Sequence, residues 1–88
     1  IEVKTDFHLA DTNNLAVEYA SRGKYSGIST TEAEWFAFVE GNDQDTIILV
    51  KTERLKSLCK KSFARKVPGG DNNTSRLVLI PFHKILER

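Results

Sequence analysis

The sequence has no methionine, a single cysteine, two histidines and two prolines among its 88 residues. Because an initiator methionine is missing, we expect that Ile1 is not the natural start of the protein. The lone Cys59 has no partner for an internal disulfide, which is typical of a reducing compartment, and we expect a cytoplasmic protein. Cys59 lies at apolar spacing on an expected helix, so a small core residue is favoured over a nucleophile.

Long apolar runs are also absent. No stretch approaches the roughly 18 consecutive apolar residues of a membrane helix, and no signal-peptide pattern is visible, so no membrane partner is expected. An apolar content of 40% in 88 residues suits one small domain over residues 1–88. Neither a phosphate-binding P-loop nor a dinucleotide fingerprint occurs, and the few histidines have no metal-finger spacing.

The net charge of +1 does not predict a nucleic-acid partner by itself, but the cations are concentrated in one stretch. Its members are Lys51, Arg54, Lys56, Lys60, Lys61, Arg65 and Lys66. Such a run can form an electrostatic footprint for phosphates. An ordinary solvated helix face is the alternative, and composition alone favours it.

Alternating apolar and polar residues predict two strands at the start of the chain, over 2–6 and 15–20, joined by a polar turn. We expect them to pair as an antiparallel hairpin, which would place Glu18 opposite residues 2–4. His8, in the connection, is expected at the surface.

Side chains two apart on a strand share a face, so Glu2, Lys4 and Asp6 should project together, and Glu18 should join them. Carboxylates and an amine on one sheet face form either a metal-and-water site or an ordinary solvated face. Asp6 is equally well interpreted as a turn residue and stays outside the primary set.

The rest of the chain alternates between strand and helix patterns. Capping-box pairs predict a short helix over 29–34, and Thr52 is expected to cap a helix that ends near Lys61. The other expected elements are strands over 35–39, 46–50 and 76–80, a helix over 82–88, and loops over 21–27 and 67–75. The order is therefore β-β-α-β-β-α-β-α, an α/β or α+β sheet flanked by helices.

Glu2-Val3-Lys4 has the (D/E)-x-K form of the PD-(D/E)XK nuclease superfamily. The longer string EVKTD, TNNLAVEY, SRGKYSGISTTEAEWFAFV and PGGDNNTS resembles small phage and bacterial endonuclease-like and Holliday-junction-resolvase-like proteins of that superfamily. The resemblance implies a restriction-endonuclease-like central mixed sheet. The leading Asp of the family pattern lies on the preceding strand, so it would fall before Ile1, and the N-terminal part of the domain would be missing.

The same resemblance implies a site for Mg²⁺ or Mn²⁺. Glu2 and Glu18 would supply carboxylate oxygens, and the main-chain carbonyl of Val3 would be a further metal ligand. Lys4 would orient the attacking water and stabilise charge on the phosphate. The expected catalytic residues are thus Glu2, Lys4 and Glu18.

A loop with two cations follows the second strand and is expected to contact nucleic acid. Its candidate residues are Arg22, Lys24, Tyr25 and Ser26. A tight turn with solvent-facing charges explains the same residues equally well.

Three hypotheses follow for function. The first is a metal-dependent endonuclease that hydrolyses DNA phosphodiester bonds, on branched or otherwise structured DNA. The second is a nuclease-fold nucleic-acid-binding protein without catalysis, and the third is a small structural or interaction domain. DNA is the expected partner, and a homodimer stays open because structure-specific nucleases often act as dimers.

Overall fold

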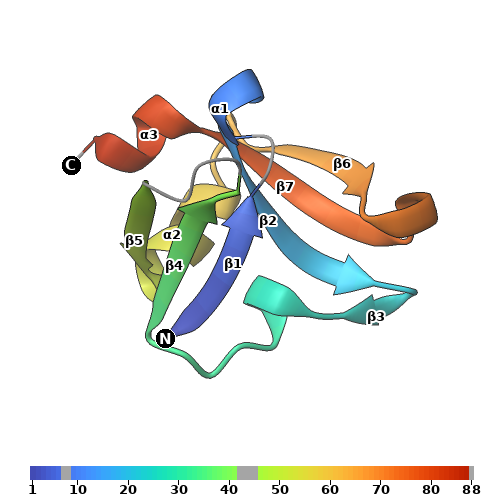
Figure 1. Cartoon of the computed structure of the whole chain (residues 1–88). Helices are drawn as coiled ribbons and strands as arrows, with labels where there is room; N and C mark the ends of the chain where they lie inside the picture. Colours follow the sequence, from blue (N-terminus) through green and yellow to red (C-terminus); the bar gives the residue numbers. More distant parts are fainter. Residues whose placement is uncertain (7–8, 42–45, 88) are drawn as a thin grey trace.

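The computed structural model describes residues 1–6, 9–41 and 46–87, which form a mixed α+β fold with two sheets (Figure 1). The first sheet has the strand order β1 (Glu2–Asp6), β4 (Trp35–Glu40), β5 (Ile47–Lys51). The second has the order β3 (Lys24–Tyr25), β2 (Asn14–Ser21), β7 (Ser75–Pro81), β6 (Arg65–Gly69). The helical segments are α1 (Leu9–Thr12), α2 (Thr52–Cys59), α3 (Phe82–Leu86) and the 3-10 turns η1 (Gly27–Ser29) and η2 (Asp71–Asn73).

The three-stranded sheet is mixed, because β1 runs parallel to β4 and β4 runs antiparallel to β5. Phe36 and Phe38 of β4 are buried on its inner face. Glu2 is in register with Phe36 and Lys4 with Phe38, so both polar side chains start from this inner face. The outer face carries exposed apolar residues, among them Val3 and Leu49.

The four-stranded sheet is antiparallel throughout, and its central pair is β2 with β7. One face supplies Leu15 and Val17 from β2 and Ile80 from β7 to the core. The register shifts between Glu18 and Ala20, so Tyr19 is the extra residue of a β-bulge. A bulge disrupts the ladder locally and increases the twist of the strand, here directly after Glu18.

Helix α2 closes the core with the apolar stripe that the sequence predicts. Leu55 and Leu58 are buried, and Cys59 packs partly buried against the same cluster. Burial raises the pKa of the Cys59 thiol to about 11, which suits a packing role and disfavours a nucleophile. None of the helices in the described residues is long and apolar enough to cross a membrane.

The predicted N-terminal hairpin is wrong. The strands themselves form, but β1 pairs with β4 and β2 pairs with β3 and β7. Alternation fixes which face of a strand is buried and says nothing about the partner strand. One side-chain contact does join β1 to β2: the buried Asp6 carboxylate accepts a hydrogen bond from the Ala16 N–H, at 3.2 Å. Asp6 is therefore a structural link between the sheets.

Three further expectations are corrected. The helix over 29–34 is replaced by η1 and a non-helical segment, because Thr31 is used in a contact with β1. Part of the loop over 67–75 belongs to β6, an edge strand that tolerates Pro68. Thr52 does not cap α2; it is the first helical residue, and its hydroxyl donates to the Ala33 carbonyl at 2.7 Å.

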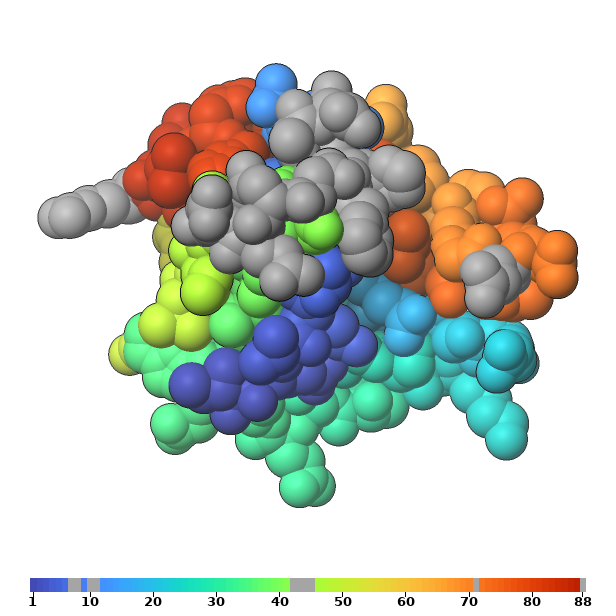
Figure 2. Space-filling view, in the orientation of Figure 1, coloured from blue at the N-terminus to red at the C-terminus, as the bar shows by residue number. Residues whose placement is uncertain are grey.

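Strands β4, β5 and β7 form close to where the sequence predicts them, whereas α1 and β3 fall on segments predicted as a turn and a loop. The antiparallel pairing of β4 with β5 is confirmed, although the turn over 42–45 lies outside the described residues, as does His8. Helices α2 and α3 form, and both are shorter than expected. Figure 2 shows the atoms of β1 at the surface of the molecule.

Candidate metal and catalytic site

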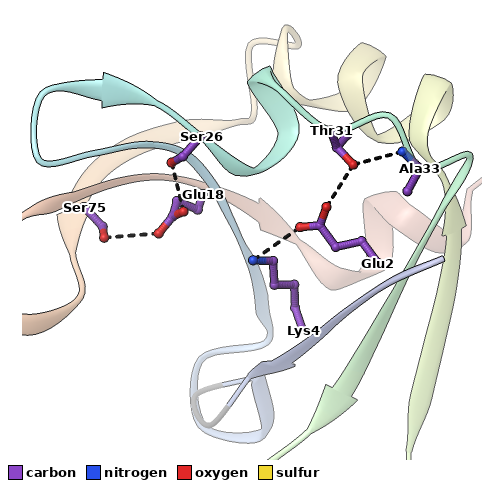
Figure 3. A network of polar contacts seen from close by, with 7 residues as sticks. All are labelled: Glu2, Lys4, Glu18, Ser26, Thr31, Ala33 and Ser75. Atoms are coloured by element: carbon purple, nitrogen blue, oxygen red, sulfur yellow. Dashed lines mark hydrogen bonds and ion pairs between the residues drawn. The ribbon is translucent and has the colours of Figure 1, made fainter.

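The site is built around an ion pair on β1. Lys4 Nζ lies 3.3 Å from Glu2 Oε2, as expected for side chains two apart on one strand face (Figure 3). The Lys4 and Glu2 side chains are 43% and 28% exposed, so the pair is open to water and to a ligand. An ion pair this exposed contributes little to stability, which leaves both groups available for chemistry.

Thr31 fixes the second oxygen of Glu2. Its hydroxyl donates to Glu2 Oε1 at 2.8 Å and accepts a hydrogen bond from the Ala33 N–H at 3.1 Å. The hydroxyl thus uses its one proton on the carboxylate, and the backbone holds it in that orientation. Thr31 is not among the residues that the sequence predicts for the site, because its capping-box pattern predicts a helix start.

The main-chain carbonyl of Val3 points to the open edge of β1. Successive carbonyls of a strand point to alternate edges, and the Asp6 carbonyl accepts from the Gly41 N–H on the β4 side, at 2.8 Å. Val3 lies an odd number of residues from Asp6, so its carbonyl points away from β4. It faces the edge of β1 that has no paired strand among the described residues. Its side chain, 61% exposed, lies on the outer sheet face. Whether this carbonyl binds a metal ion stays a prediction.

Glu18 lies on β2, in a separate group of contacts. Ser26 Oγ donates to Glu18 Oε2 at 2.9 Å, and Ser75 Oγ donates to Glu18 Oε1 at 3.1 Å. Figure 3 shows this group apart from the Glu2 group, with no contact drawn between them. The structure therefore joins Glu2 to Lys4, while Glu18 is held by hydroxyls from β7 and from the residue before η1.

Gly27 allows the segment 26–29 to lie close to the backbone of Glu18. Its φ of 53° is in the left-handed region, and a Cβ there would lie 2.2 Å from the Glu18 carbonyl oxygen. The bulge residue Tyr19 adds two contacts to the same segment, because its carbonyl accepts from the Ser26 N–H and from Ser29 Oγ. The segment 26–29 is therefore packed closely on the bulge beside Glu18.

The loop expected to bind nucleic acid is a tight β2–β3 hairpin whose tip projects from the molecule (Figure 1). Arg22 and Gly23 occupy its two central positions with positive φ, and Tyr25 is 78% exposed. Within the described residues, Ser26 is the member of this set whose side chain contacts a predicted catalytic residue. The exposed cations Arg22 and Lys24 lie on the hairpin, as either interpretation of the loop requires.

The donor set has the chemistry of a hard-cation site, although it is small. Among the side chains that the structure describes, no three from histidine, cysteine or acidic residues come close enough to hold a metal ion together. Mg²⁺ needs only one or two carboxylates and keeps several waters. Glu2 and the Val3 carbonyl are oxygen donors of this kind, whereas Glu18 lies in a separate group of contacts.

The comparisons with known proteins leave the family open. Protein-family models, curated proteins and solved structures give no match to this chain. What the chain does must therefore be argued from its own residues.

Proposed function

We propose that this chain is a nuclease domain of the PD-(D/E)XK kind, with a restriction-endonuclease-like core, which hydrolyses DNA phosphodiester bonds with Mg²⁺ or Mn²⁺. The observation that carries the proposal is the Glu2–Lys4 pair, 3.3 Å apart on one face of β1. It places the acid and the amine of the (D/E)-x-K motif side by side on a strand, at a partly exposed position.

Each residue of the pair has a defined task in this proposal. A bound divalent cation supplies Lewis-acid activation of the phosphate and lowers the pKa of water. Glu2 and the Val3 carbonyl hold the ion, while Thr31 keeps the Glu2 carboxylate in place. Lys4 orients the attacking water and neutralises the charge that develops on the phosphate oxygens.

Glu18 is the second acid in this proposal. Its two oxygens already accept from Ser26 and Ser75, so the carboxylate is oriented before a ligand arrives. We assign it a contact to the hydrated ion through water, since its contacts keep it in a group separate from Glu2. The proposed substrate is branched or otherwise structured DNA, as for the resolvase-like proteins that the sequence resembles.

The test is nicking of plasmid and four-way-junction DNA in Mg²⁺ or Mn²⁺. The unmodified chain is expected to cut, chelation is expected to stop cutting, and Lys4→Ala is expected to slow cutting by roughly 10²–10³-fold. Lys61→Ala is the matched control, because it removes the same charge from an exposed lysine outside the site. Cutting by Lys4→Ala at the rate of the Lys61→Ala control would refute the assignment.

A nucleic-acid-binding protein without catalysis is the second candidate. It is favoured by one observation: the described residues contain no cluster of three potential metal-ligating side chains. Salt-sensitive DNA binding, with no cutting in either metal, is the result that would select it.

A further inference from the structure

A groove of about 310 Å³ runs between α2, β6 and the β2 bulge. Buried Ile28 and Val78 form part of its floor, next to the bulge residue Tyr19. The full lining is Tyr19, Ile28, Ser29, Lys56, Cys59, Lys60, Lys66 and Val78, which includes three lysines and no acidic residue. Three of the seven cations of the basic stretch thus lie around an apolar floor.

The three lysines are placed to hold consecutive negative charges. Lys56 and Lys60 are four residues apart at the end of α2, so their Cβ atoms are expected to lie about 5–6 Å apart on one side. Lys66 comes from β6, and its Nζ lies 5.6 Å from the centre of the Tyr19 ring. Among the described residues, none of the three ammonium groups forms an ion pair, so their charge is available to a ligand.

The groove shares one lining residue, Lys56, with a second cleft of about 470 Å³. This cleft also contains Thr31, whose hydroxyl holds Glu2, and the acids Glu32, Glu34 and Glu53. The acids disfavour a phosphate there, so the basic groove is the part of this surface that suits a polyanion.

We propose that this groove binds a single-stranded segment of nucleic acid, with Lys56, Lys60 and Lys66 on the phosphates. The inference rests on the proposed nuclease function and adds a substrate class to it. Grooves for single strands combine cations that follow the backbone with aromatic and apolar surface for the bases. In a duplex the base faces are stacked on one another, so the apolar floor would have nothing to contact.

Binding without cleavage tests the groove. Fluorescence anisotropy of labelled oligo(dT) would be measured in Ca²⁺ over a series of salt concentrations, with the unmodified chain and with a triple variant, K56Q/K60Q/K66Q. The triple variant is expected to bind more weakly and to lose about 2 from the slope of log K against log salt, at about 0.7 for each single-strand phosphate contact. Lys61→Gln, which removes a neighbouring exposed lysine outside the groove, is expected to keep both values.

Cys59 gives an independent test of whether oligo(dT) occupies the groove, since it is the only cysteine of the chain and lines the groove. Oligo(dT) is expected to slow the alkylation of Cys59 by N-ethylmaleimide. The reaction is run at a pH near the ordinary thiol pKa of 9.0, and mass spectrometry measures its extent. A small thiol in the same solution controls for reagent loss. The triple variant is expected to show no protection.

Several results would overturn the inference. The first is an equal loss of affinity for oligo(dT) in Lys61→Gln and in the triple variant. The second is binding of blunt duplex DNA as tight as that of oligo(dT). The third is a Cys59 alkylation rate that saturating oligo(dT) leaves unchanged. Competition by an acidic peptide that is as effective as competition by unlabelled DNA would also overturn the inference. If the triple variant cuts DNA and binds oligo(dT) as tightly as the unmodified chain, the groove proposal alone is rejected. If the unmodified chain binds oligo(dT) through the groove lysines but cuts no DNA, the nuclease proposal alone is rejected.

Discussion

Glu2 and Glu18 are both acids on strands, and hydroxyl groups hold both, but their surroundings differ in one respect. Glu2 has one hydroxyl, from Thr31, and one ammonium, from Lys4. Glu18 has two hydroxyls, and they come from β7 and from the residue before η1. The acid beside a cation can take part in charge chemistry, whereas the acid between two serines joins elements that are distant in the sequence. The predictions below separate these roles.

Lys4→Ala should have the largest effect on function and a small one on stability. Loss of one electrostatic stabiliser of a transition state typically costs roughly 10²–10³-fold in rate. Stability should change by less than about 0.5 kcal/mol, because the ion pair is exposed. Single-turnover cutting and urea unfolding measure the two. A loss of stability as severe as the loss of rate would assign Lys4 a structural role instead.

Gly27→Ala should have the largest effect on stability. The new Cβ would meet the Glu18 carbonyl oxygen, and alanine disfavours this positive φ, so we expect a loss of about 2–3 kcal/mol. Gly23→Ala is the matched control: its φ is also positive, at 80°, but nothing lies within 4 Å of its added Cβ. Urea unfolding of both variants measures the difference, and equal losses would mean that the contact with Glu18 is unimportant.

Ser75→Ala should cost less, about 1 kcal/mol, because it removes one hydrogen bond to Glu18 at a buried position. Thr31→Val, which removes the corresponding hydroxyl from Glu2, should cost a similar amount in stability and should also reduce cutting. Thermal unfolding and the nicking assay compare the two variants. If Ser75→Ala reduced cutting as much as Thr31→Val, Glu18 would belong to the reacting groups as fully as Glu2.

The smallest effect concerns Cys59 and alkaline pH. Burial raises the pKa of its thiol from 9.0 to about 11, so the folded chain holds the proton more tightly than the unfolded chain. This contribution to stability should be complete below about pH 9 and should be lost as the pH rises toward 11. The difference in melting temperature between the unmodified chain and Cys59→Ala, followed over this range, isolates it. A difference independent of pH would contradict it.

Local patterns located most of the strands and helices and the face of β1 that carries Glu2 and Lys4. They did not predict which strands pair, because the Asn14–Ser21 strand has the same alternation whether it lies beside β1 or β7. Edge strand β6 was hidden by Pro68 and by the glycines that follow it.

Sequence patterns also could not locate the hydroxyls that hold the acids. Thr31 is 29 residues from Glu2, and Ser75 is 57 residues from Glu18. Such distant contacts depend on the packing of the whole fold, which local spacing does not encode.

The parallel pairing of β1 with β4 has a consequence for how the protein reaches its active form. Glu2 is in register with Phe36, 34 positions later, so strand β1 pairs with β4 only after that segment has been synthesised and has closed a long loop. Contacts of this separation form slowly, since the entropy of loop closure must be overcome first. A nascent chain that ends before Phe36 would already carry the Glu-Val-Lys motif, but it would lack the pairing with β4 that places the motif in the described sheet.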